Sequence, residues 1–265
     1  MNLFKKAAVI TDIHFGLKSN SQLHNEDCLN FVKWAADKAR AEGCETCLFL
    51  GDWHNNRASI NIVTLNYSLR ALEYLNERFD AVFFIPGNHD LYYRDKRDIQ
   101  SVEWARHLPR VKICNDWFSD GDVVIAPWLV GDDHKRISKY NAKYMFGHFE
   151  LPGYLMNAMV AMPDHCELCG DDLQNFEHVF TGHFHKRQTK RNVTYIGNCF
   201  PHNYADAGDA HDDLHQTGAA EKLDHEKMRR EREEHAEAED LQRMRPANER
   251  GPEPDRVQER QAARD

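Results

Sequence analysis

The stretch AAVITDIH, residues 7–14, sets a pattern that recurs along the chain. Its first five residues form a short, mostly apolar run, which predicts a buried strand over residues 7–11. Two side chains that can bind a metal, Asp12 and His14, follow the run directly. In open α/β sheets, ligands bind where strands end and loops begin. This exit is therefore a candidate binding site.

Four further polar blocks each follow an apolar run in the same way. They are Gly51-Asp52, Gly87-Asn88-His89-Asp90, Gly147-His148 and Gly182-His183-Phe184-His185. The five blocks together supply carboxylate, amide and imidazole groups, which suit two divalent ions such as Mn²⁺, Fe or Zn²⁺. Two metals about 3.5–4 Å apart need a bridging ligand. Asp52, which stands alone in its block, is the expected bridge, and the expected chemistry is hydrolysis at phosphorus.

Apolar periodicity predicts an α/β fold. Strands are expected over residues 7–11, 47–50 and 81–85, with helices over 26–40 and 60–78 between them. The second half is richer in strands, and a helix is expected over residues 132–140. Further strands are expected over residues 123–126, 144–146, 178–181 and 194–196. Strand–helix alternation followed by strands predicts two sheets flanked by helices.

Composition divides the chain near residue 208. All 28 aromatic residues precede residue 209, and residues 209–265 hold 17 acidic and 11 basic side chains, a net charge of −6. The whole chain carries −9, so residues 1–208 carry only −3. We therefore expect a folded domain over residues 1–208. The charged tail over residues 209–265 is expected to be disordered, or to form a helix on a partner.

The start of the chain and its cysteines predict a cytoplasmic protein. The N-terminal apolar run is too short for a signal peptide, and no apolar stretch approaches the roughly 18 residues of a membrane span. Seven cysteines, an odd number, indicate reduced thiols. The net negative charge excludes a global basic field for nucleic acid.

The five blocks resemble the motif series of the calcineurin-like metallophosphoesterase superfamily, D-x-H, G-D, G-N-H-[DE], G-H and G-H-x-H. The resemblance implies a four-layer α/β/β/α sandwich with two metal ions. One ion would take Asp12, His14, Asp52 and His185, and the other would take Asp52, Asn88, His148 and His183. A metal-bridging hydroxide would attack phosphorus. His89 would be the catalytic imidazole that assists the leaving oxygen, and Asp90 would orient it.

Three flanking stretches look like the nuclease subunits of the SbcD type, including those of phages. They are HFGLK (residues 14–18), GHFEL (residues 147–151) and YIGN (residues 195–198), the last running on to AGD (residues 207–209). This narrower resemblance implies Mn²⁺-dependent exo- or endonuclease activity on DNA in recombination or repair. It also implies an SMC/ABC-type ATPase partner. A homodimer is possible, and a phage-encoded chain would work in the host cytoplasm.

Two departures from those nucleases affect the inference. The second block reads GDWHNN (residues 51–56), where His54 is either a second active-site histidine or an exposed loop histidine. After AGD the relatives carry an ATPase-binding segment, whereas this chain opens into the charged tail, which puts the ATPase partner in doubt.

Two clusters of side chains are candidates for substrate contacts. Four cations follow His185 within six residues, Lys186, Arg187, Lys190 and Arg191, and would suit a DNA backbone. Tyr92 and Arg94 follow the third block, where they could stack an unpaired base and hold a phosphate. The alternatives are a solvated basic turn for the first cluster and tyrosines that only pack for the second.

Two C-x-x-C pairs, Cys44/Cys47 and Cys166/Cys169, offer a further alternative. The first pair abuts a predicted strand and is expected to be buried thiols. The second pair, with His165 beside it, could hold a structural zinc ion.

Three functions remain open from the sequence. The leading one is a two-metal DNA nuclease. The near-neutral domain also suits a phosphatase or a small-molecule phosphodiesterase, such as one for cyclic nucleotides, that uses the same site. The third is a scaffold with a structural metal site, which the His89-Asp90 pair disfavours because a scaffold has no need of a proton donor.

Overall fold

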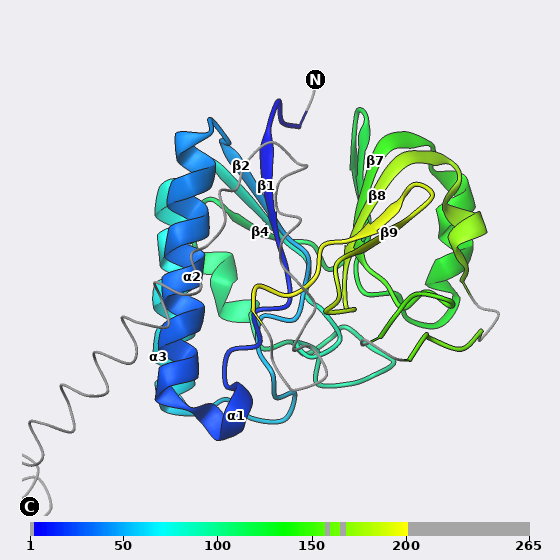
Figure 1. Ribbon diagram of the computed structural model, residues 1–265. Helices are drawn as coiled ribbons and strands as arrows, with labels where there is room; N and C mark the ends of the chain where they lie inside the picture. The colour runs from blue at the N-terminus through cyan, green and yellow to red at the C-terminus, as the bar shows by residue number, and fades with distance from the viewer. Residues whose placement is uncertain (1–2, 157–159, 165–167, 201–265) are drawn as a thin grey trace, which may run out of the picture. The chain divides into compact units, whose positions relative to one another are not determined.

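A computed structural model describes residues 3–156, 160–164 and 168–200. They form a mixed α/β arrangement with two sheets (Figure 1). The first sheet is fully parallel, in the order β1-β2-β3-β4. Its strands are β1 (Ala7–Ile10), β2 (Thr46–Phe49), β3 (Ala81–Phe84) and β4 (Val111–Ile113).

The second sheet has the order β5-β6-β7-β8-β10-β9. Its strands are β5 (Phe118–Asp120), β6 (Val123–Ile125), β7 (Ala142–His148), β8 (Phe176–Gly182), β9 (Gln188–Lys190) and β10 (Val193–Tyr195). The four inner strands run parallel, and the edge strands β5 and β9 are antiparallel to their neighbours. In both sheets, therefore, the parallel strands end at a common edge.

Two long helices, α2 (Gln22–Ala41) and α3 (Ile62–Arg78), cover the outer face of the first sheet (Figure 1). Each begins at a side-chain cap: the Ser21 side chain accepts from the His24 backbone, and the Asn61 side chain accepts from Val63. The other described helices are short. They are α1 (Leu17–Asn20) and the 3₁₀ helices η1 (Glu103–His107), η2 (Gly131–Lys139) and η3 (Gly170–Leu173).

Alternating side chains on the strands of the first sheet explain the layers. Cys47 and Phe49 of β2 face the core beneath the helices, whereas Leu48 and Leu50 pack with Phe146 between the two sheets. A third core, which includes Leu173 of η3 and Ile137 of η2, covers the far face of the second sheet. Burial on both faces is why the parallel strands read as continuous apolar runs.

The predicted α/β class with two sheets is confirmed, with differences in detail. The helix expected over residues 132–140 is the 3₁₀ helix η2, so 3₁₀ turns cover the outer face of the second sheet. Strands β4, β5 and β9 were not predicted, because their sequences VKI, FSD and QTK contain no continuous apolar run. Within the described residues, no helix combines the length and apolar character needed to cross a bilayer. The charged tail and AGD (residues 207–209) lie outside those residues.

Candidate metal centre

The five blocks meet at the edge where the parallel strands end. β1 leads to Asp12 and His14, β2 to Asp52, and β3 to Asn88 and His89. β7 ends in His148, and β8 leads to His183 and His185. The β1–β2 ladder continues past the strands, because the Asp12 amide donates to Gly51 at 2.9 Å and the His14 amide donates to Asp52 at 3.0 Å.

Asp12, His14 and His185 form the first cluster. One ligand atom from each lies within 4.8 Å of the others. The Nε2 atoms of His14 and His185 are 3.2 Å apart, and His14 Nε2 lies 3.8 Å from Asp12 Oδ1. Two ligands about 2.1 Å from one ion at a tetrahedral angle lie roughly 3.4 Å apart, so this spacing fits a shared divalent metal. The Thr11 hydroxyl donates to Asp12 Oδ2 at 2.7 Å and fixes that carboxylate.

Asp52, His148 and His183 form the second cluster, again with ligand atoms within 4.8 Å of one another. The Asn88 side-chain oxygen lies 3.1 Å from His148 Nε2 and 3.0 Å from His183 Nδ1. His148 Nδ1 donates to the Leu50 carbonyl at 2.6 Å, which leaves Nε2 for a metal.

The Asp52 carboxylate lies between the two clusters. Its Oδ2 atom is 3.7 Å from His14 Nε2 and 3.5 Å from His148 Nε2, while Oδ1 accepts from the His89 amide at 2.9 Å. Burial alone would raise the pKa of Asp52, but the imidazoles of His148 and His14 outweigh it and hold the pKa well below its usual value. The ionised oxygen placed between the clusters is suited to bridging two cations.

Several of these residues have left-handed backbone conformations. The φ angles are 53° at Asp12, 56° at His14, 59° at Asp52 and 92° at His183. Non-glycine residues rarely adopt such angles, and strained backbone concentrates at functional sites. Gly51, at φ 105°, precedes Asp52, and a Cβ atom there would overlap His148 Nδ1. These tight turns allow five separate loops to converge on one small volume.

His89 lies beside the first cluster, with its ring centroid 5.0 Å from that of His14. His89 Nδ1 donates to the Asn55 carbonyl at 2.8 Å.

The expectation that Asp90 orients the His89 ring is wrong. The buried Asp90 carboxylate instead accepts from the backbone amides of Trp53, His54 and Gly87 at 2.9–3.1 Å. Burial and the charge of Asp52 raise the pKa of Asp90 to about 6. Asp90 therefore links the loop after β2, which carries Asp52, to the loop after β3, which carries His89.

The structure contradicts both expectations for His54. Its side chain is neither exposed nor in reach of substrate, because it is 1% exposed. Its ring nitrogens lie 2.8 Å from the hydroxyls of Ser101 and Ser68. Burial lowers the pKa of His54 to about 3, so the ring stays neutral. His54 is a packing residue beneath the site.

The basic stretch after His185 divides in two. Lys186 and Arg187 precede β9, near the site, and are half-buried. Lys190 and Arg191 lie at the opposite end of the β9–β10 hairpin, where they contact Gly153 and Asp171, respectively. The expectation of four cations beside the site is therefore wrong for the second pair.

The loop after the third block is exposed and carries the other predicted contacts. Tyr92 is 50% exposed, Arg94 is exposed, and Tyr92 packs edge-on against Tyr93 with ring centroids 4.9 Å apart.

The first C-x-x-C pair, Cys44 and Cys47, consists of buried free thiols, as expected. Cys166 and His165 of the proposed zinc site lie outside the described residues.

Sequence reasoning missed two residues that position the site. The buried Tyr195 hydroxyl donates to the Phe149 carbonyl at 2.9 Å and accepts from the Leu151 amide at 3.1 Å. It thereby pins the segment directly after His148. The second is Asn55, which holds His89 through its carbonyl, a backbone atom that no sequence motif reports. Tyr195 does open the stretch YIGN, so its place in a motif was the available signal.

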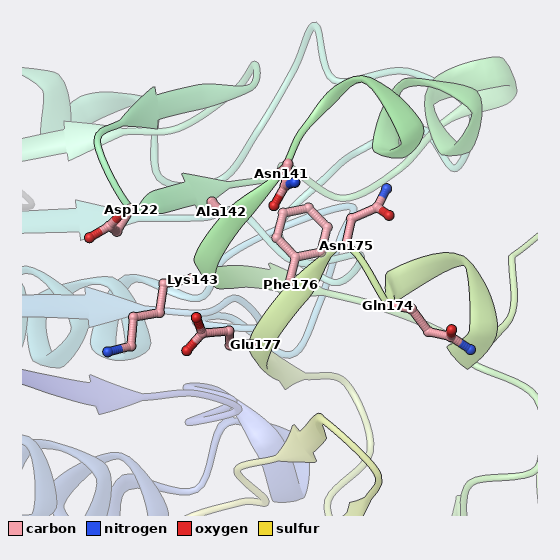
Figure 2. A pocket seen from close by; sticks show the side chains of 8 residues that line it. All are labelled: Asp122, Asn141, Ala142, Lys143, Gln174, Asn175, Phe176 and Glu177. Carbon is pink, nitrogen blue, oxygen red and sulfur yellow. The ribbon is translucent and has the colours of Figure 1, made fainter.

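A hollow of about 660 Å³ lies elsewhere on the second sheet (Figure 2). Asp122, Ala142, Lys143, Phe176 and Glu177 line it, together with three amide side chains. These residues mark the beginnings of β6, β7 and β8, whereas the five blocks follow strand ends. The hollow therefore shares no residue with the metal centre.

Comparison with known proteins agrees with this geometry. The family model for the calcineurin-like phosphoesterases matches residues 5–187. Exonuclease subunit 1 of Enterobacteria phage T4 is 27% identical over 195 residues, an alignment that covers 70% of this chain. The chain spans 57% of the length of that relative.

Two solved structures are similar at 15% identity. The Pseudomonas putida nuclease MPE has a TM-score of 0.37, with 75% of this chain and 82% of that chain covered. A dimetal phosphatase from Danio rerio has a TM-score of 0.43, with 71% and 85% covered.

Proposed function

Because the chain belongs to the calcineurin-like phosphoesterase family and is a metal-dependent phosphoesterase, we propose that it is a two-metal nuclease that cleaves DNA. The observation that carries the two-metal part is the position of Asp52 Oδ2, 3.7 Å and 3.5 Å from imidazole nitrogens of the two clusters. Asp12, His14, Asp52 and His185 would hold one ion, and Asp52, Asn88, His148 and His183 would hold the other. Mn²⁺ is the proposed metal.

Two divalent ions at such a site stabilise both the attacking and the leaving oxygens of an in-line displacement at phosphorus. His89 would supply the proton in that reaction. Since His89 Nδ1 donates to Asn55, the protonated ring carries its second proton on Nε2. Nε2 would give this proton to the leaving oxygen as the bond from phosphorus to that oxygen breaks. The Asn55 carbonyl fixes the orientation of the ring.

The proposal of DNA as the substrate rests on three observations. The curated relative is named an exonuclease subunit. Lys186 and Arg187 follow the ligand His185 directly and could contact the phosphate backbone. The loop with Tyr92 and Arg94 presents an aromatic ring and a cation next to the third block. By the same likeness we propose a partner subunit of the SMC/ABC ATPase type, a role in recombination or repair, and a cytoplasmic site of action.

One assay separates this proposal from its alternative. Purified protein with Mn²⁺ is offered linear DNA, bis-p-nitrophenyl phosphate and p-nitrophenyl phosphate. We expect the protein to degrade DNA, and Asp52→Ala and His183→Ala to abolish the activity. His107→Ala is the matched control, because His107 is exposed on η1 away from the clusters. Hydrolysis of the small esters without any cleavage of DNA would instead identify a phosphatase or small-molecule phosphodiesterase.

A further inference from the structure

We propose that Trp128 determines specificity by stacking against an unpaired nucleobase next to the scissile phosphate. The inference rests on the proposed function, because it names the part of a DNA strand that the site contacts. Trp128 lies in none of the five blocks. It comes three residues after the end of β6, at the same sheet edge as the metal centre.

The indole of Trp128 forms a wall of the second cluster. Its ring centroid lies 5.6 Å from that of His148 and 5.3 Å from that of His183, at interplanar angles of 62° and 49°. The residue is half-buried, so part of the side chain remains open to solvent beside these imidazoles. A substrate phosphate that reached both clusters would bring its neighbouring groups against this ring.

The indole N–H is available to a ligand. Trp53 donates its N–H to Ser68 at 2.8 Å, and Trp104 donates to Ser101 at 3.0 Å. Trp128 Nε1 has no hydrogen-bond partner among residues 3–156, 160–164 and 168–200, and it is not buried. An indole N–H that is open to solvent beside the second cluster can donate to a bound ligand.

The backbone of Trp128 is held by Arg97. Arg97 Nη1 donates to the Trp128 carbonyl at 2.8 Å and pairs with Asp133 at 2.5 Å, while Nε donates to Asn115 at 3.0 Å. Arg97 itself lies in the exposed loop that carries Tyr92 and Arg94. Arg97 thus fixes the backbone of Trp128 relative to that loop. A side chain that is already held in place loses little conformational freedom when it binds a ligand.

An unpaired base is the ligand that this wall fits. Aromatic side chains stack on bases of any sequence, and a base must leave the duplex stack before its face can meet a protein ring. The expected preference is therefore for single-stranded or frayed DNA, with little dependence on base identity.

The test compares two diesters that share a leaving group. The p-nitrophenyl esters of thymidine 5′- and 3′-phosphate carry a base, whereas methyl p-nitrophenyl phosphate does not. We expect wild-type protein to prefer at least one thymidine ester in kcat/KM. Trp128→Ala should lower that preference about tenfold, while Trp128→Phe should retain most of it. Calorimetric binding of thymidine 5′-monophosphate, relative to methyl phosphate, should weaken in the same order.

Metal content separates stacking from structural support. Trp128→Ala should keep the wild-type metal content by elemental analysis. The inference is overturned if wild-type protein shows no preference for the thymidine esters, if Trp128→Ala slows all the diesters equally, or if that variant loses metal. Failure of the proposed function gives a different result. Wild-type protein would then prefer the thymidine esters and Trp128→Ala would lose that preference, but neither protein would cleave DNA.

Discussion

The Nδ1 atom of His89 donates a 2.8 Å hydrogen bond to the backbone carbonyl of Asn55. This contact joins the third block to the end of the second and sets which nitrogen of the ring can face substrate. His89 has no ligand atom in either cluster. Proton donation and metal binding are therefore assigned to different side chains, and mutation can separate them.

Replacing His89 by alanine should preserve metal binding and lower turnover. Loss of a general acid typically slows a reaction about 100- to 10,000-fold. Metal content by elemental analysis and kcat on linear DNA would be measured together. His107→Ala should change neither quantity. Loss of metal from His89→Ala would contradict the assignment.

Replacing Asp90 by alanine should destabilise the fold. The change leaves three buried amides, those of Trp53, His54 and Gly87, without their acceptor. Each unsatisfied group costs about 1–3 kcal/mol, so we expect a loss of about 3 kcal/mol or more. Tm by calorimetry should fall by roughly 10 °C.

Asp95→Ala is the control for Asp90, since Asp95 is exposed on the following loop. A variant at Asp90 that kept the wild-type Tm and lost only activity would show that Asp90 acts on the reaction itself.

Replacing Tyr195 by phenylalanine removes the hydroxyl between Phe149 and Leu151. The ring is fully buried, so the two backbone groups would lack a replacement partner. We expect a stability loss of about 1–3 kcal/mol by urea denaturation and weaker metal binding at the second cluster. Tyr93→Phe, on the exposed loop, should show neither effect. Unchanged metal affinity in Tyr195→Phe would mean that His148 is held without this bridge.

Replacing Gly87 by alanine should disrupt the metal centre. A Cβ atom at residue 87 would overlap both Oδ1 and the backbone nitrogen of Asp52, so the carboxylate would have to move. Metal content should fall while the circular dichroism of the domain is retained. Gly170→Ala is the control, because only the Tyr154 hydroxyl, at 3.9 Å, lies near the added atom. Full metal occupancy in Gly87→Ala would refute the tight packing of the two blocks.

Much of the fold could be predicted from the sequence because the buried strands carry a strong pattern. The run CLFL (residues 47–50) predicted a strand, which the structure buries on both faces, and the polar blocks after such runs located the sheet edge. The division of the candidate ligands between two ions came instead from the resemblance to the calcineurin-like metallophosphoesterases.

The side-chain partners could not be predicted, because tertiary contacts decide them. His54 follows the candidate ligand Asp52 closely in sequence, yet it is buried against Ser68 and Ser101. Asp90 follows His89 directly, yet it bonds to backbone amides instead. Adjacency in sequence does not give side-chain direction at turns where residues such as Asp52 have positive φ.

We propose that the Asp52 carboxylate bridges two metal ions. The most direct measurement is the number of Mn²⁺ ions per chain, by equilibrium dialysis and elemental analysis, in wild-type protein and in Asp52→Ala. Wild type should bind two ions per chain. Asp52→Ala should bind fewer than one at the same free Mn²⁺, since both clusters lose a ligand. Two ions retained in Asp52→Ala, or a single ion at saturation in wild type, would contradict the claim.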